Sequence, residues 1–149
     1  MGKNKKLYNI IFPVWLLWLI PALWIIIIPG NFIFDSLVLI VSMYALKINN
    51  KKTFYKKHIF KIFLFGMLSD IIGALFMWTM IMVFETSAFG DDWYVTIPGV
   101  LISAGMIFLF NYFVTFRKLD KKERMKLSLI ITAITAPYTF FIPAKWIYF

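Results

Sequence analysis

Two aspartates stand in otherwise apolar stretches of this sequence, and their surroundings make them the residues best placed to do chemistry. Asp70 lies within LFGMLSDIIGALF, residues 64–76, and Asp35 lies within NFIFDSLVLI, residues 31–40. Neither stretch contains a lysine or an arginine. A buried carboxyl group without a basic partner is either protonated or paired with a cation from solution. We therefore expect Asp70 and Asp35 to form a proton, cation or substrate site.

Hydroxyl and amide side chains in other apolar stretches could complete this site. Helical spacing places the polar residues of segment 95–116 on one face, and those of segment 127–144 on one face of another helix. We predict Asn111 as a third binding residue beside the two aspartates. The predicted polar lining consists of Ser69, Ser103, Thr132 and Thr135. Such stripes line either a hydrated path or a helix–helix interface, and the sequence leaves both open.

The composition indicates the class of protein that must hold these residues. Of 149 residues, 62% are hydrophobic and 15% are charged, whereas about a quarter of the residues in a globular chain are charged. Several apolar stretches are long enough to cross a bilayer as helices. We predict an all-α integral membrane protein whose single domain, residues 1–149, is a bundle of five transmembrane helices. The predicted spans are residues 7–28, 32–46, 59–84, 95–116 and 127–144.

Prolines mark the expected ends and bends of these helices. The tripeptide Pro29-Gly30-Asn31 is typical of a turn and is expected to separate the first two spans. Pro137 is expected to kink the fifth span. A kink there could free a backbone carbonyl to coordinate a ligand, as happens in the discontinuous helices of transporters.

The predicted spans place the two aspartates at similar heights in antiparallel neighbours. Gly66 and Gly73 share the helix face of Asp70, so another helix can approach it closely. If the faces pack together, the two carboxyl groups can share one proton or one cation. In the alternative, the short second span places Asp35 near the outer surface, where Asn31 or Asp35 would bind free backbone donors at a helix N-terminus.

The distribution of positive charge predicts the orientation. Fifteen of the sixteen lysines and arginines fall in the N-terminal segment and in the segments after the second and fourth predicted spans. By the positive-inside rule the N-terminus is cytoplasmic and the C-terminus is outside, in a multi-pass protein of the cell membrane. The net charge of +9 then indicates anionic lipid at the cytoplasmic loops as a partner, and not nucleic acid.

Other kinds of site find little support in the sequence. There is no cysteine, which excludes disulfides and thiolate metal sites, and no glycine-rich phosphate loop occurs. His58, the single histidine, lies among lysines and is expected at the surface. We expect no metal site, no cofactor and no catalytic residue.

Three classes of function are compatible with these residues. A proton- or cation-coupled transporter or channel for a small solute or ion is favoured, with Asp70 and Asp35 at its centre. An accessory or structural subunit that docks on a partner or self-associates is the alternative. An intramembrane aspartyl protease is the third and is disfavoured, because "FDS" and "SDIIG" lack the glycine-leucine-glycine-aspartate stretch of that family. The lysine, isoleucine and asparagine bias is typical of AT-rich bacterial genomes, so we expect a bacterial inner membrane. We also expect a homo-oligomer.

Overall fold

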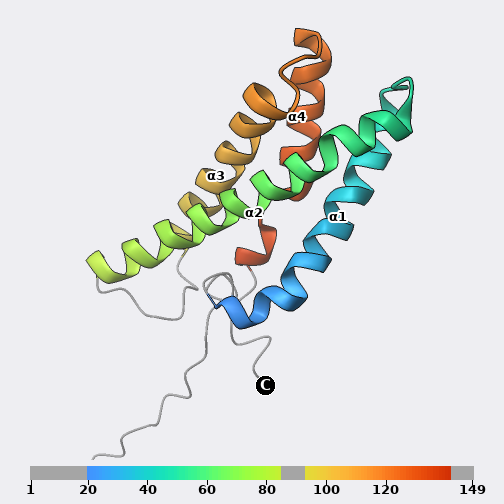
Figure 1. The fold of residues 1–149 in the computed structure, drawn as a ribbon. Helices are drawn as coiled ribbons and strands as arrows, with labels where there is room; N and C mark the ends of the chain where they lie inside the picture. The colour runs from blue at the N-terminus through green and yellow to red at the C-terminus, as the bar shows by residue number, and fades with distance from the viewer. Residues whose placement is uncertain (1–19, 85–92, 142–149) are drawn as a thin grey trace, which may run out of the picture.

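The computed structural model describes residues 20–84 and 93–141, and every regular element within these ranges is helical (Figure 1). The long helices are α1 (Trp24–Ala45), α2 (Lys51–Phe84), α3 (Trp93–Phe110) and α4 (Lys121–Thr135). The short elements are the 3-10 helices η2 (Pro21–Leu23) and η4 (Tyr138–Phe141) and the π-helix η3 (Asn111–Thr115). The predicted all-α class is therefore confirmed for this part of the chain.

Three helical segments are long and apolar enough to cross a membrane, and they are Pro21–Ala45, Lys51–Phe84 and Trp93–Thr115. Their outward faces are strongly apolar, since Ile25, Val41 and Leu101 are 80%, 61% and 65% exposed. The buried residues include several polar ones, such as Asp35 and Asp70. Apolar residues outside and polar residues inside are the arrangement expected of a protein surrounded by lipid.

Helix α1 continues through Pro29-Gly30-Asn31, where the sequence predicts a turn. Pro29 has no N–H, so the helix loses the bond to the carbonyl of Ile25. A turn in lipid would leave several backbone groups without any partner, which costs more than one missing helical bond. The predicted boundary between the first two spans is therefore wrong. The predicted residues 7–19 of the first span lie outside the described residues.

Helix α4 ends at Thr135, whereas the predicted fifth span continues to residue 144. Ala136 is extended, with φ −52° and ψ 145°, because the ring of Pro137 disfavours a helical residue before it. With 15 residues at about 1.5 Å each, α4 alone is too short to cross a hydrocarbon core of about 30 Å. The helix is thus broken at the predicted kink, and the count of five spans stays a prediction.

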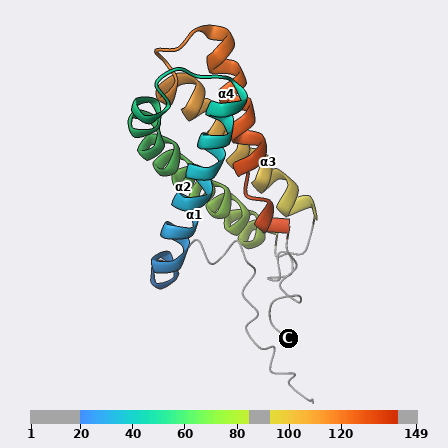
Figure 2. The ribbon, with the colours of Figure 1, turned by 90° about the vertical axis from the view of Figure 1, so that its right-hand side faces the viewer.

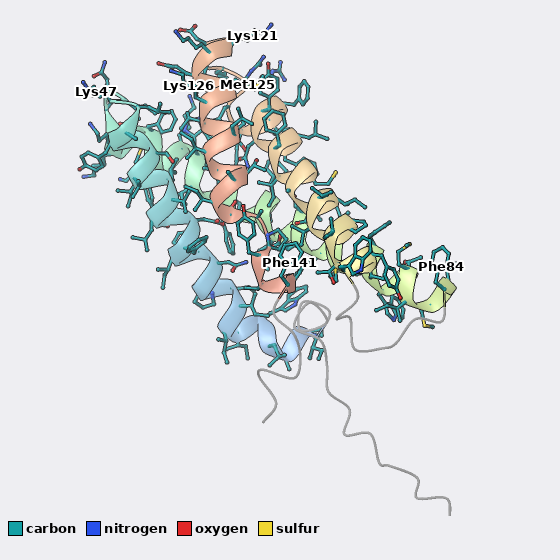
Figure 3. All side chains as sticks on the ribbon, turned by 180° about the vertical axis from the view of Figure 1, so that it is seen from behind. Lys47, Phe84, Lys121, Met125, Lys126 and Phe141 are labelled. Atoms are coloured by element: carbon teal, nitrogen blue, oxygen red, sulfur yellow. The ribbon has the colours of Figure 1, made fainter. Side chains whose placement is uncertain are left out.

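The helices form two hairpins, α1 with α2 and α3 with α4, whose turns lie at the same end of the bundle (Figures 1 and 2). All twelve lysines and arginines of the described residues fall within residues 47–61 and 117–126, around these turns. Figure 3 shows Lys47, Lys121 and Lys126 gathered at this end, which we call the basic end. The predicted clustering of these two basic segments on one side agrees with this arrangement.

Two apolar cores fill the bundle. The core nearer the basic end consists of Val38, Leu39, Met43, Ile59, Ile62, Ile107, Phe116, Leu127 and Ile131. The second core consists of Met67, Ala74, Met77, Val95, Val100 and Phe140. Ser103 lies between the two cores along α3, and Asp70 lies within the stretch of α2 that contributes to the second core. These polar residues are therefore held among apolar side chains.

Helices α2 and α3 approach each other closely at two glycines. A Cβ atom on Gly73 would lie 2.9 Å from the Cβ of Ser103 and 3.0 Å from the carbonyl oxygen of Gly99. A Cβ atom on Gly99 would overlap the side chain of Met77. Glycine at both positions therefore allows the two backbones to meet, as small residues do between membrane helices. This contact brings Ser103 of α3 to the face of α2 that carries Asp70.

Candidate functional site

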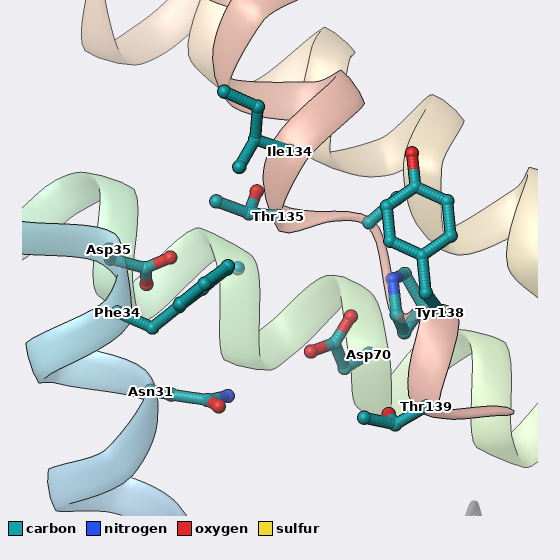
Figure 4. A pocket seen from close by; sticks show the side chains of 11 residues that line it. Asn31, Phe34, Asp35, Asp70, Ile134, Thr135, Tyr138 and Thr139 are labelled. Carbon is teal, nitrogen blue, oxygen red and sulfur yellow. The ribbon is translucent and has the colours of Figure 1, made fainter. Parts of the chain in front are cut away.

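A cavity of about 280 Å³ lies between α1, α2 and the break that separates α4 from η4 (Figure 4). Its lining consists of Asn31, Phe34, Asp35, Gly66, Asp70 and residues 134–139. We call it the mid-bundle pocket. Figure 4 shows the carboxyl groups of Asp35 and Asp70 extending from α1 and α2 into the same space. The two aspartates thus share one pocket.

Asp70 is held from the α3 side. Its side chain is 5% exposed, and the hydroxyl of Ser103 donates a hydrogen bond of 2.8 Å to its Oδ1 atom. This contact ties the carboxyl group to α3 and so fixes its orientation. Ser103 therefore positions Asp70 without being one of the residues that line the cavity.

Asp35 lies against a gap that glycine leaves in α2. Its side chain is 6% exposed, and a Cβ atom on Gly66 would lie 3.5 Å from its Oδ2 atom. Because α1 begins at Trp24, Asp35 stands in the middle of the helix and not in its first turn. The N-cap residue Leu23 has no side-chain capping bond. The alternative expectation that Asn31 or Asp35 binds backbone donors at a helix N-terminus is therefore wrong.

The break after α4 forms the third wall of the pocket. Pro137 cannot donate to the carbonyl of Ala133, and the hydroxyl of Tyr138 donates to that carbonyl in its place. The N–H of Tyr138 donates to Ala136 at 2.7 Å, so it does not reach the carbonyl of Ile134 as it would in a continuous helix. Ile134 lines the pocket. The predicted freeing of a backbone carbonyl is not found at Ala133, whose carbonyl Tyr138 occupies, and it stays a prediction for Ile134.

The chemistry available in the pocket is that of oxygen ligands. Carboxylates, the amide of Asn31 and the hydroxyls of Thr135 and Thr139 are the groups that hard cations and protons bind. No lysine or arginine is among the lining residues. Within residues 20–84 and 93–141 there is no cluster of three or more histidine, cysteine or acidic residues. The donors suit a proton or a weakly held monovalent cation better than a transition metal.

Three of the predicted site residues lie elsewhere. The hydroxyl of Ser69 donates to the carbonyl of Phe65 at 2.6 Å and so is satisfied within its own helix. The amide nitrogen of Asn111 donates to Ile107 at 2.9 Å, while its oxygen is buried without a partner among the described residues. The hydroxyl oxygen of Thr132 is also buried without such a partner. None of the three lines the mid-bundle pocket, whereas the predicted Thr135 does.

Sequence reasoning missed two polar residues of the pocket. The sequence predicts Asn31 in a turn, because a proline and a glycine precede it, yet Asn31 lies within α1 and lines the pocket. Thr139 lies in η4, beyond the break. Its spacing of four residues from Thr135 on the predicted polar stripe was a usable signal. Asn31 had no comparable signal, because its position depends on the continuity of α1.

His58 also differs from its prediction. The sequence places it at the surface, but it is 4% exposed. Its ring lies 4.2 Å from that of Phe54 and 5.4 Å from that of Phe116, measured between centroids. The Nδ1 atom donates to the carbonyl of Phe54 at 2.8 Å. Aromatic neighbours from α2 and from the end of η3 therefore bury a residue that stands among exposed lysines in the sequence.

Comparisons with known proteins give no relative: no family model, no curated protein and no solved structure matches this chain. Its function is therefore inferred from the fold and from the chemistry of the mid-bundle pocket.

Proposed function

We propose that this protein is a proton- or cation-coupled transporter or channel for a small solute or ion, and that the mid-bundle pocket is its binding site. Asp35 and Asp70 take up the proton or the cation, and Asn31, Thr135 and Thr139 supply further oxygen or hydroxyl groups. Ser103 positions Asp70 through its hydrogen bond.

One observation carries this proposal. Two carboxyl groups meet a helix break in a cavity that no basic side chain lines. A charged carboxylate within the bilayer costs about 2.5 to 3.5 kcal/mol even on lenient insertion scales, so two of them need a positive partner. Discontinuous helices in transporters place free carbonyls beside their ions for the same reason. A bound proton or cation supplies the charge that the pocket lacks.

The alternative function, an accessory subunit held together by polar contacts, has one specific observation in its favour. Asp70 is hydrogen-bonded to Ser103 across the α2–α3 contact, and a protonated aspartate can join two helices in this way. This role gives no reason for Asp35 to face the same cavity. It also predicts no response to cations, which makes the two functions separable by experiment.

We further propose a multi-pass protein of the cell membrane with the basic end toward the cytoplasm, as the positive-inside rule requires. The positions of the two termini, the five-span count and self-association remain predictions.

The test measures ion flux across proteoliposomes that contain the purified chain. It is run with and without a pH gradient, and with Na⁺, K⁺ or neither. Asp70→Asn removes the charge while it keeps the shape and the hydrogen-bond acceptor for Ser103. We expect this variant to lose at least about tenfold in flux, because its amide cannot exchange the coupling charge. Ser69→Ala is the matched control, since Ser69 is buried beside Asp70 but bonds only to its own helix.

Equal flux in the native chain, Asp70→Asn and protein-free vesicles would contradict the transport function. If Asp70→Asn is also as stable as the native chain in every cation, the accessory role replaces it.

A further inference from the structure

A second cavity, of about 490 Å³, lies at the basic end between the first turns of α2 and the end of η3. Its lining consists of Lys57, His58, Lys61, Phe113, Val114, Thr115, Arg117 and Lys118. We call it the basic pocket. A smaller cavity of about 210 Å³ adjoins it and shares Lys57, His58 and Lys118 with it. The two together make a hollow that reaches from the turn after α1 to the turn after η3.

The lining of the basic pocket has charge of one sign only. Four of its residues are lysine or arginine, and no aspartate or glutamate is among them. The C-terminal end of the helix formed by α3 and η3 adds a partial negative charge of about half a unit, which is small beside four positive charges. Like charges gathered around one hollow repel each other unless an anion lies between them. The pocket is therefore electrostatically suited to an anion.

Thr115 is a buried residue of this lining. It is 4% exposed, and its hydroxyl oxygen is enclosed and has no hydrogen-bond partner among the described residues. The hydroxyls of Ser128 and Thr132 in α4 are in the same position. The hydroxyl of Thr115 therefore does not open into the hollow.

A π-turn stands beside Thr115. The carbonyl of Asn111 accepts the N–H of Phe116 at 2.9 Å, a bond that spans five residues and marks the turn. Single π-turns occur often at functional sites. This turn places Phe113, Val114 and Thr115 in the wall of the basic pocket.

The walls of the basic pocket beside Thr115 are rigid and partly apolar. His58 is packed between Phe54 and Phe116, and its Nδ1 atom is occupied by a backbone carbonyl, so only Nε2 could meet a ligand. Phe113 and Val114 line the pocket yet are 58% and 44% exposed on the outer surface. A ligand with both an anionic group and hydrocarbon chains would match cations and apolar surface together.

We propose that the basic pocket binds the phosphate group of an anionic phospholipid, with Lys61 and Arg117 pairing the phosphate and the acyl chains lying along Phe113 and Val114. This goes beyond the general attraction of basic loops to an anionic surface, because it assigns one phosphate to one pocket. It does not depend on transport through the mid-bundle pocket. Arginine and lysine are the usual phosphate partners in proteins.

The test uses the full-length chain in detergent, stripped of lipid and titrated with short-chain phosphatidylglycerol, short-chain phosphatidylcholine or inorganic phosphate, with native mass spectrometry as the readout. The double variant Lys61→Gln/Arg117→Gln should lower phosphatidylglycerol affinity about tenfold or more, because two charge-assisted contacts are lost. Lys61→Gln and Arg117→Gln as single variants should each lower it about threefold to tenfold, because one contact is lost in each. The matched control Lys52→Gln/Lys122→Gln removes the same charge from exposed sites outside both hollows and should leave it within about twofold.

Equal losses in the pocket variant and in the control would overturn the proposal, because the lysines would then act only as a diffuse surface. Inorganic phosphate that binds as tightly as phosphatidylglycerol would overturn the lipid assignment in favour of a soluble phosphate compound. Thermal unfolding shows whether each variant is folded. If the double variant is not folded, the single variants Lys61→Gln and Arg117→Gln decide the matter, and an unchanged affinity in both would overturn the proposal.

Discussion

The mid-bundle pocket and the basic pocket each gather charge of one sign without a balancing side chain, but at different depths. Two acids and no base line the first, and four bases and no acid line the second. The first lies among apolar side chains in the middle of the bundle, whereas the second opens beside the helix ends. In the two proposals depth matches the occupant, because a proton or small cation suits a site among apolar side chains, and a bulky anion suits a site beside helix ends.

The largest expected effect separates the two pockets by a single substitution. Asp70→Asn should abolish stabilisation of the purified protein by its cation, which amounts to about 2.7 kcal/mol at a cation concentration of one hundred times Kd. Binding of phosphatidylglycerol should not change, because Asp70 is remote from the basic pocket lining. Thermal unfolding across a cation series measures the stabilisation, and lipid titration measures the binding of phosphatidylglycerol. A loss of both responses would mean that the pockets are one coupled unit.

A methyl group at the α2–α3 contact tests how far the mid-bundle pocket depends on close helix packing. Gly73→Ala places a Cβ atom 2.9 Å from that of Ser103, so we expect a loss of about 1 to 3 kcal/mol in unfolding free energy. Gly105→Ala is the matched control, because nothing lies within 4 Å of its Cβ position. Unfolding in mixed detergent measures both variants. Equal stability of the two would show that the backbones can separate without cost.

Restoring the helix after α4 should weaken the mid-bundle pocket alone. Pro137→Ala regains an N–H for the carbonyl of Ala133, which lets α4 extend and engages the carbonyl of Ile134. We expect about a tenfold loss of cation affinity, equal to about 1.4 kcal/mol, with stability kept or raised. Pro98→Ala, inside α3 and outside the pocket lining, should leave the affinity unchanged. Cation titration by thermal shift compares the two, and unchanged affinity in Pro137→Ala would exclude a role for the break.

The smallest expected effect comes from salt. Raising ionic strength with a bulky organic salt from about 0.1 M to 1 M shortens the Debye length from about 10 Å to 3 Å. Phosphatidylglycerol affinity should fall a few-fold at the exposed basic pocket, while cation binding at the buried aspartates should change less. Parallel titrations at the two salt concentrations give the comparison. A larger salt effect at the aspartates would place them in contact with bulk solvent.

The sequence was informative where a residue conflicted with its surroundings. A lone acid in an apolar stretch is conspicuous, so Asp35 and Asp70 could be identified before any fold was known. A lysine beside a membrane span is expected for topology alone, so nothing distinguished Lys61 or Arg117 from the other basic residues. The π-turn that places Phe113 and Val114 in the wall of the basic pocket leaves no pattern in the sequence.

The errors at helix boundaries have a common physical origin. Pro29-Gly30-Asn31 would form a turn in water, which can bind the freed backbone groups. In lipid those groups have no other partner, and helix α1 continues. At Pro137 the helix does end, because the hydroxyl of Tyr138 satisfies the carbonyl that the proline leaves free. Whether a proline bends or ends a membrane helix thus depends on a replacement donor nearby.

The glycine contact between α2 and α3 also decides which elements surround the two aspartates. Gly73 brings α2 against α3 and lies near the ring of Phe140, so η4 packs against the same contact. On the other side of α2, the hydrogen bond of 2.8 Å between Ser36 and Tyr55 holds α1 in place. The two carboxyl groups are therefore carried by helices that are fastened on both sides of α2, and a substitution that loosens either contact is expected to disturb both groups together.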